Sequence, residues 1–166
     1  MRDKTCCFTG HRKLPEVGRA EIALKTTEAI EELLSEGYYR FCAGGALGFD
    51  TLAALTVLLM KDLSPQIELH LILPCKDQAR SWSPMDQACY LHILFRADSV
   101  TFASESYTRD CMHRRNRQLV DSSSACICYL TRPTGGTACT VRYAQSQGLR
   151  LLLIPNSKFH IQKVLS

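Results

Sequence analysis

The chain has 166 residues, 46% of them hydrophobic, which is the size of one domain and enough apolar content for a single core. No apolar run approaches the roughly 18 residues that cross a membrane, and the opening Met1-Arg2-Asp3-Lys4 leads into a predicted strand rather than a signal peptide. The net charge of +4 permits an anionic ligand but is too modest to favour nucleic acid as a partner. We therefore expect one cytoplasmic domain over residues 1–166, with no membrane association.

Nine cysteines are an odd number for a disulfide framework, and their spacing contains no CxxC pair. Most of them fall inside predicted strands and helices, where a thiol packs as a small hydrophobe in a reducing compartment. Cys126 and Cys128, two residues apart in a predicted strand, are expected to share one strand face for core packing. We expect neither a metal site nor a cofactor.

Apolar runs and amphipathic stretches alternate along the chain. The runs predict strands at 5–9, 38–43, 67–73, 99–102, 125–130 and 150–154. Helices are predicted at 16–36, 49–62, 84–96, 109–122 and 138–147. This alternation predicts an α/β fold, a doubly wound and mainly parallel Rossmann-like sheet of about six strands with helices on both faces.

Two of the predicted helices have informative apolar patterns. The helix at 16–36 is expected to pack on the sheet through Val17, Ala20, Leu24, Thr27, Ile30 and Leu34, and to stop at Gly37. The helix at 49–62 is apolar nearly all round, so part of its surface is expected either to meet a second subunit in a homodimer or higher homo-oligomer, or to be buried. The loop at 74–82 is predicted to be a mobile lid.

Two glycine turns join a predicted strand to a predicted helix at the carboxyl edge of the sheet, where ligands of such folds bind. A phosphate suits the free N–H groups of a helix start, so Gly135, Gly136 and Thr137 form one predicted anion seat. The run from Gly44 to Gly48 forms the second. Neither is a G-x-G-x-x-G or P-loop motif, and such turns also occur simply to connect elements. Cations expected at the same edge are Arg12, Lys76, Arg80, Arg109 and Arg132, although exposed loops are commonly basic.

Other polar residues near these turns are further candidates for contact with a ligand. Asp50 could accept a bond from a ribose hydroxyl or hold the glycine turn from Gly44 to Gly48 through backbone N–H groups. Asn116 is predicted on an apolar helix stripe with Arg115 near its edge, which indicates a pair that reaches the ligand. His11 could protonate a leaving group or donate a structural hydrogen bond.

Four motifs in order resemble the YpsA-like family of the SLOG superfamily, which includes DprA and the LOG phosphoribohydrolases. They are Cys7-Phe8-Thr9-Gly10-His11-Arg12, Gly44-Gly45-Ala46-Leu47-Gly48-Phe49-Asp50, Met112-x-x-Arg115-Asn116-x-x-Leu119-Val120-Asp121 and Gly135-Gly136-Thr137-x-x-Thr140. The resemblance implies a Rossmann-like fold, frequent dimers and a nucleotide-type ligand at the carboxyl edge. Expected ligand contacts are Thr9, Gly10, Arg12, Gly44, Gly45, Ala46, Gly48, Asp50, Gly135, Gly136, Thr137 and Thr140.

The LOG enzymes suggest a catalytic alternative. Their Met-His-x-Arg-Lys run is similar to residues 112–116, which would make Arg115 catalytic together with Asn116 and His11. The glutamate that follows their glycine turn has no counterpart here, because Ala138, Cys139 and Thr140 occupy that stretch, although Asp50 or Asp121 could substitute. We therefore expect binding of a nucleotide-type ligand by a sensor or regulatory module, ahead of N-glycosidic hydrolysis and of DprA-like binding of single-stranded nucleic acid.

Overall fold

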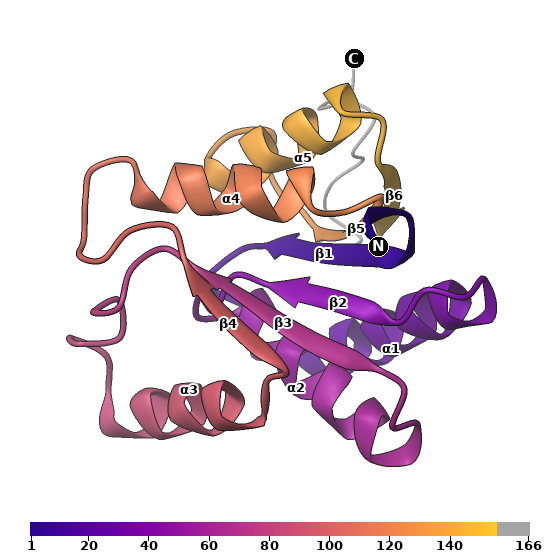
Figure 1. Cartoon of the computed structure of the whole chain (residues 1–166), viewed down its shortest axis with the longest axis horizontal. Helices are drawn as coiled ribbons and strands as arrows, with labels where there is room; N and C mark the ends of the chain where they lie inside the picture. Colours follow the sequence, from indigo (N-terminus) through magenta and orange to yellow (C-terminus); the bar gives the residue numbers. More distant parts are fainter. Residues whose placement is uncertain (156–166) are drawn as a thin grey trace.

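A computed structural model describes residues 1–155 and has a six-stranded sheet at its centre (Figure 1). The strands are all parallel and lie in the order β4-β3-β2-β1-β5-β6. They span Thr5–Gly10 (β1), Arg40–Ala43 (β2), Glu68–Leu73 (β3), Ser99–Phe102 (β4), Ala125–Tyr129 (β5) and Arg150–Leu153 (β6). The doubly wound α/β architecture predicted from the sequence is confirmed.

Helices cover both faces of the sheet (Figure 1). They span Arg19–Ser35 (α1), Phe49–Leu63 (α2), Pro84–Arg96 (α3), Cys111–Asp121 (α4) and Gly136–Ser146 (α5). The first three lie on one face, and α4 and α5 lie side by side on the other. None of the helices within residues 1–155 is long and apolar enough to cross a membrane.

The central strands β1 and β5 are buried on both sides. Toward α1 and α2 the core is aromatic, with Phe8 stacked on Phe41 and edge-on to Phe49. Toward α4 and α5 it contains small thiols, including Cys126 and Cys128, whose sulfur atoms are 3.5 Å apart. Most cysteines are therefore buried, as predicted, and Cys139 is exposed.

Helix α1 buries a different face from the one predicted. Its buried residues are Ile22, Thr26, Ile30 and Leu33, whereas Val17 is 92% exposed and precedes the helix. The buried stripe contains Thr26, whose hydroxyl donates a hydrogen bond to the Ile22 carbonyl. This bond removes the free-energy cost of burying an unpaired hydroxyl. The predicted stripe shares Ile30 with the observed one, and its Thr27 and Leu34 are half-buried.

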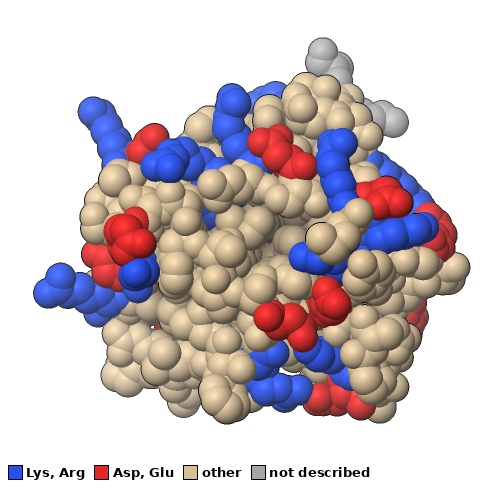
Figure 2. Space-filling model, viewed as in Figure 1, with Lys and Arg blue, Asp and Glu red and all other residues tan. Residues whose placement is uncertain are grey.

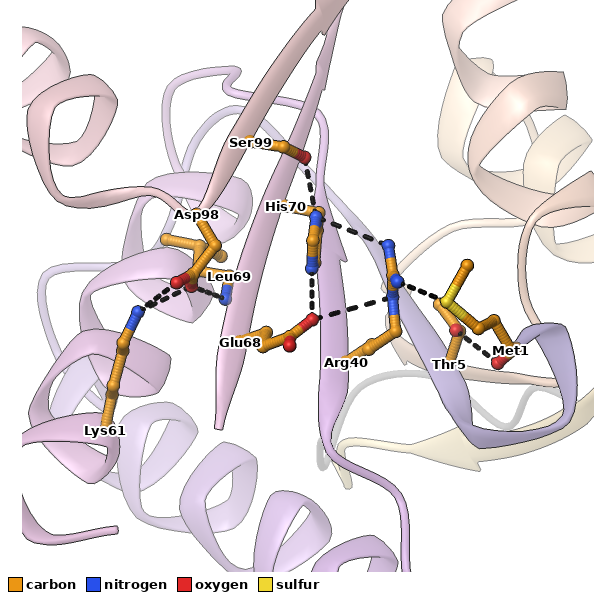
Figure 3. A network of polar contacts seen from close by, with 9 residues as sticks. All are labelled: Met1, Thr5, Arg40, Lys61, Glu68, Leu69, His70, Asp98 and Ser99. Atoms are coloured by element: carbon orange, nitrogen blue, oxygen red, sulfur yellow. Dashed lines mark hydrogen bonds and ion pairs between the residues drawn. The ribbon is translucent and has the colours of Figure 1, made fainter. Parts of the chain in front are cut away.

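Strand β3 alternates between half-buried and buried side chains, so one of its faces is less covered. On that face the His70 ring contacts Glu68 through Nε2 at 2.7 Å and Ser99 through Nδ1 at 2.6 Å. Figure 3 shows how this network continues to Arg40 and the amino terminus. Polar side chains pair with one another here where apolar packing is incomplete, although Nε of Arg40 is buried without a hydrogen-bond partner in residues 1–155.

The segment predicted to be a lid is tied to the body of the protein. Gln78 donates to the Gly45 carbonyl at 3.3 Å and to the Tyr90 hydroxyl at 3.1 Å. Trp82 packs edge-on against Tyr90, with ring centroids 5.3 Å apart. On helix α2, Leu59 and Leu63 are exposed, and their contact with a second subunit stays a prediction.

Candidate ligand-binding site at the carboxyl edge of the sheet

The strand order reverses at β1, because later strands are added on one side up to β4 and on the other side from β5. Ligands of doubly wound sheets bind in the crevice at such a reversal. A cavity of about 570 Å³ lies there, between the loops that follow β1 and β5 and the helix α4. It has the size of a small-molecule site.

The structure brings most of the predicted site residues to this cavity. Those that line it are Thr9, Gly10, His11, Arg12, Ala46, Asp50, Arg115, Asn116, Gly136 and Thr137. Gly44, Gly45, Gly48, Gly135 and Thr140 do not line it. Lining residues that the prediction did not include are Phe8, Lys13, Met112, Leu119 and Thr131. The apolar residues of this set were expected in the core. Lys13 could have been predicted as a lining residue, because it follows Arg12 directly in the sequence.

The first glycine turn, which follows β2, packs against protein. A Cβ built on Gly44 would lie 2.1 Å from Nη1 of Arg115, and one on Gly48 would lie 2.3 Å from the Arg12 carbonyl oxygen. The Asp50 carboxylate accepts a hydrogen bond from the Ala46 N–H at 3.2 Å. Asp50 therefore holds this turn in the way that its structural reading predicted.

Arg115 is the buried centre of helix α4. Only 6% of it is exposed, whereas Asn116 is half-buried, which reverses the order that the predicted stripe gave them. Its guanidinium donates to the Gly44 carbonyl, lies 3.6 Å from Oδ2 of Asp50, and donates from Nε to Oδ1 of Asn116 at 2.7 Å. These partners make the burial of a charged group tolerable. Two of them, Gly44 and Asp50, are distant in the sequence, so the residues around Arg115 do not reveal them.

Burial shifts the pKa values of this ion pair in opposite directions. It raises the pKa of the Asp50 carboxyl and lowers the pKa of the Arg115 guanidinium, while the attraction between the two charges opposes both shifts. Arginine stays protonated in proteins, so a fixed cation lies next to the Asp50 carboxyl group and favours its ionised form against the effect of burial.

His11 connects the two loops on either side of the crevice. Its Nε2 accepts a hydrogen bond from the Thr131 N–H at 2.8 Å, so the proton of the neutral ring is on Nδ1. Burial, together with the charge of Arg132, lowers the pKa of His11. The predicted structural hydrogen bond therefore exists, but His11 is its acceptor rather than its donor.

The second glycine turn, which precedes α5, is open. Gly135 has a φ of +97°, which favours glycine, and it makes no side-chain cap. Within residues 1–155, no atom other than those of its chain neighbours and its own helix backbone lies within 4 Å of a Cβ built on Gly136. The Thr140 hydroxyl donates back to the Gly136 carbonyl at 2.9 Å, and no side chain in residues 1–155 accepts a hydrogen bond from the first-turn N–H groups. This helix start faces the cavity with its positive dipole end.

Three cations besides Arg115 line the cavity, namely Arg12, Lys13 and Arg132. In residues 1–155 their side chains make no recorded ion pair. The other cations expected here are not lining residues, and Lys76 pairs with Glu105 at 2.6 Å. Only part of the predicted basic cluster therefore converges.

Comparisons with known proteins agree with this fold and these motifs. The YpsA family model, described as "YspA SLOG family", matches residues 11–150. The uncharacterized SPbeta prophage-derived protein YoqJ of Bacillus subtilis (strain 168) is 30% identical over 134 residues, which cover 73% of this chain and 78% of YoqJ.

Two solved structures of DNA processing protein A (DprA) have a similar fold. The X-ray structure of the Streptococcus pneumoniae protein matches with a TM-score of 0.69 and 18% identity, over 93% of this chain and 51% of that one. The Helicobacter pylori structure, which concerns single-stranded DNA binding by that protein, matches with a TM-score of 0.65 and 17% identity, over 92% and 65%. This chain spans only about half to two thirds of these DprA chains, and the likeness establishes the fold alone. With the family match covering most of its length, the chain belongs to the YpsA family of the SLOG superfamily.

Proposed function

We propose that this protein binds a nucleotide or nucleotide-derived ligand in the cavity between β1 and β5, as a sensor or regulatory module. The observation that carries the proposal is the open start of α5, where Gly136 and Thr137 line the cavity and no side chain from the described part of the chain caps the helix. Uncapped first-turn N–H groups are strong donors to a phosphate. The ligand phosphate sits at this turn.

The charges around the cavity support an anionic ligand. Arg12, Lys13 and Arg132 contribute positive charge, and the single carboxylate among the lining residues, Asp50, is balanced by Arg115. The cavity therefore has an excess of positive charge at its mouth and a neutral pair at its floor. A phosphate that enters it gains charge-assisted hydrogen bonds without displacing an existing partner.

Gly136→Asp tests the phosphate seat. The site has room for a side chain, and an acid in the first helical turn favours the helix, so the fold should persist. The added carboxylate should repel a phosphate. Calorimetry against mono-, di- and cyclic nucleotides and ADP-ribose derivatives should detect binding to the wild type and none to the variant.

Gly136→Ala is the matched control, because it adds a Cβ without charge. It should bind within a few-fold of the wild type. A wild-type protein that responds to no phosphate-bearing compound, or a Gly136→Asp variant that binds as well as Gly136→Ala, would contradict the proposal.

Hydrolysis of an N-glycosidic bond, with Arg115 as a catalytic residue, has less support. Asp50 uses one carboxylate oxygen to hold its own turn, and Asp121 accepts from the Tyr143 hydroxyl at 2.8 Å without lining the cavity. His11 is an acceptor with a lowered pKa, which suits a general acid poorly. Chromatography after incubation with nucleoside 5′-monophosphates would show free base only if hydrolysis occurs, and Arg115→Ala should then abolish the release.

Binding of single-stranded nucleic acid is the second candidate, because the similar Helicobacter pylori protein has a single-stranded DNA binding mode. That comparison leans against our expectation that nucleic acid is not a partner. Against it, Figure 2 shows Lys and Arg interspersed with Asp and Glu over the face in view, without a continuous basic band. An oligonucleotide gel shift at two salt concentrations decides, because phosphate contacts must weaken as salt rises.

A further inference from the structure

The floor of the cavity, on the side of α4, differs chemically from its mouth. One guanidinium, that of Arg115, contacts Asp50 through Nη1 and Asn116 through Nε. In each of these two contacts, one of the two terminal polar atoms of the Asp50 or Asn116 side chain faces the guanidinium, and the other does not. The floor therefore presents a second set of hydrogen-bonding groups, separate from the phosphate seat.

The atom that Asp50 leaves is an acceptor. Its Oδ2 faces Arg115 and accepts from the Ala46 N–H, while Oδ1 has no recorded hydrogen-bond partner in residues 1–155. The buried side-chain nitrogen and oxygen atoms without a hydrogen-bond partner in those residues are Nε of Arg40 and Oε1 of Gln78. Oδ1 of Asp50 is not one of them, so it is accessible to solvent. Since Asp50 lines the cavity, Oδ1 is open to a ligand there.

The atom that Asn116 leaves is a donor. Its Oδ1 accepts from Nε of Arg115 at 2.7 Å, which fixes the orientation of the amide and turns the NH₂ group away from the guanidinium. No hydrogen bond from this NH₂ group is recorded in residues 1–155, and Asn116 also lines the cavity. A carboxylate acceptor and an amide donor thus lie on either side of one fixed cation.

Neighbouring hydroxyl groups of a sugar match this arrangement, because each hydroxyl both donates and accepts. We infer that Asp50 and Asn116 bind the ribose 2′- and 3′-hydroxyls, so that the site selects ribonucleotides over deoxyribonucleotides. The inference rests on the proposed function, since the phosphate seat brings the sugar to the floor. A cavity of about 570 Å³ is large enough for both groups of one ligand.

Asp50 is suited to this discrimination because it is buried. A charged acceptor left without a donor in a buried site is costly, so a ligand that lacks the hydroxyl loses more than one neutral hydrogen bond. Affinity should fall by roughly tenfold or more when the 2′-hydroxyl is removed. A further fall is expected when the 3′-hydroxyl is removed too.

The test uses calorimetric titration of the full chain with the four nucleoside 5′-monophosphates, their 2′-deoxy counterparts and their 2′,3′-dideoxy counterparts. Asp50→Asn should bring the ribo-to-2′-deoxy affinity ratio close to one, and Asn116→Ala should reduce the preference for the ribo over the 2′,3′-dideoxy compounds. Glu31→Gln is the matched control, because Glu31 is exposed on α1 outside the cavity, and it should keep the wild-type ratio. Asn116→Ala keeps the test decisive if Asp50→Asn does not fold.

Inorganic phosphate and Gly136→Asp separate the two proposals. If ribo- and deoxyribonucleotides bind equally and Gly136→Asp abolishes both, the phosphate seat stands and the sugar inference is wrong. If no nucleotide binds and inorganic phosphate gives no response, the proposed function is wrong, and the sugar inference that rests on it is wrong as well. A preference for ribose that survives in both Asp50→Asn and Asn116→Ala would also overturn the inference.

Discussion

The two glycine turns of this protein look alike in sequence but differ in what surrounds them. The turn after β2 is filled, because Arg115 and Asp50 occupy the space next to Gly44. The turn before α5 is open, because no side chain of the described residues lies within 4 Å of a Cβ built on Gly136. Glycine is needed at the first to let protein approach, and it leaves space for a ligand at the second. Stability should therefore depend on one turn and binding on the other.

Gly44→Ala should have the largest effect on stability. A methyl group there would displace the Arg115 guanidinium from both the Gly44 carbonyl and Asp50. Breaking a buried ion pair costs roughly 3 to 5 kcal/mol, and urea denaturation should show a loss of about that size. If the variant unfolds within about 0.5 kcal/mol of the wild type, the first turn is not filled as described.

Asp50→Asn should be the next most destabilising change. The asparagine still offers an oxygen to the Ala46 N–H, but Arg115 is left as a buried cation without its counter-ion. We expect a loss of about 3 kcal/mol in the free energy of unfolding. Asp110→Asn, an exposed control at the start of α4, should cost far less.

His11 should make stability depend on pH. Its pKa is lowered in the folded state, so below the ordinary value of about 6.5 the unfolded chain binds a proton that the folded chain does not. The free energy of unfolding should thus fall as the pH drops through that value, and the His11 contribution is complete above it. His11→Gln should flatten this slope between pH 7 and pH 5, whereas His92→Gln, an exposed control, should leave it unchanged.

The smallest stability effects should come from the open turn. Gly136→Ala and Gly136→Asp both place a side chain in free space, at a helical position with ordinary backbone angles. We expect changes of about 0.5 kcal/mol or less by the same denaturation assay, with Asp the more favourable because of the helix dipole. A large loss in either variant would erase the contrast between the two turns.

Much of the fold could be predicted because local chemistry marks its elements. Helix α3 begins and ends as expected, since Ser83 caps it by accepting from the Asp86 N–H and Pro84 opens its first turn. The choice of edge for the site followed from the alternation of strands and helices.

The rest could not be predicted, because it depends on contacts between distant residues. Arg115 is buried only because Gly44 and Asp50, more than 60 residues earlier, supply its partners. Cys111 and Leu119 lie four residues on either side of Arg115 and are buried with it, but this spacing does not indicate which groups would pair with a buried arginine. The same contact between Arg115 and Gly44 determines that the turn after β2, rather than the turn before α5, is filled by protein atoms.

The hydrogen bond from the Thr131 amide to His11 gives this site a built-in reporter. An amide in an exposed loop normally exchanges its proton with water quickly, but this one is held by an imidazole nitrogen at 2.8 Å. When the ring takes up a proton, Nε2 ceases to be an acceptor and the amide is released. The Thr131 amide resonance thus reports the protonation state of His11, and its shift on adding a ligand would mark arrival between the two loops without any label.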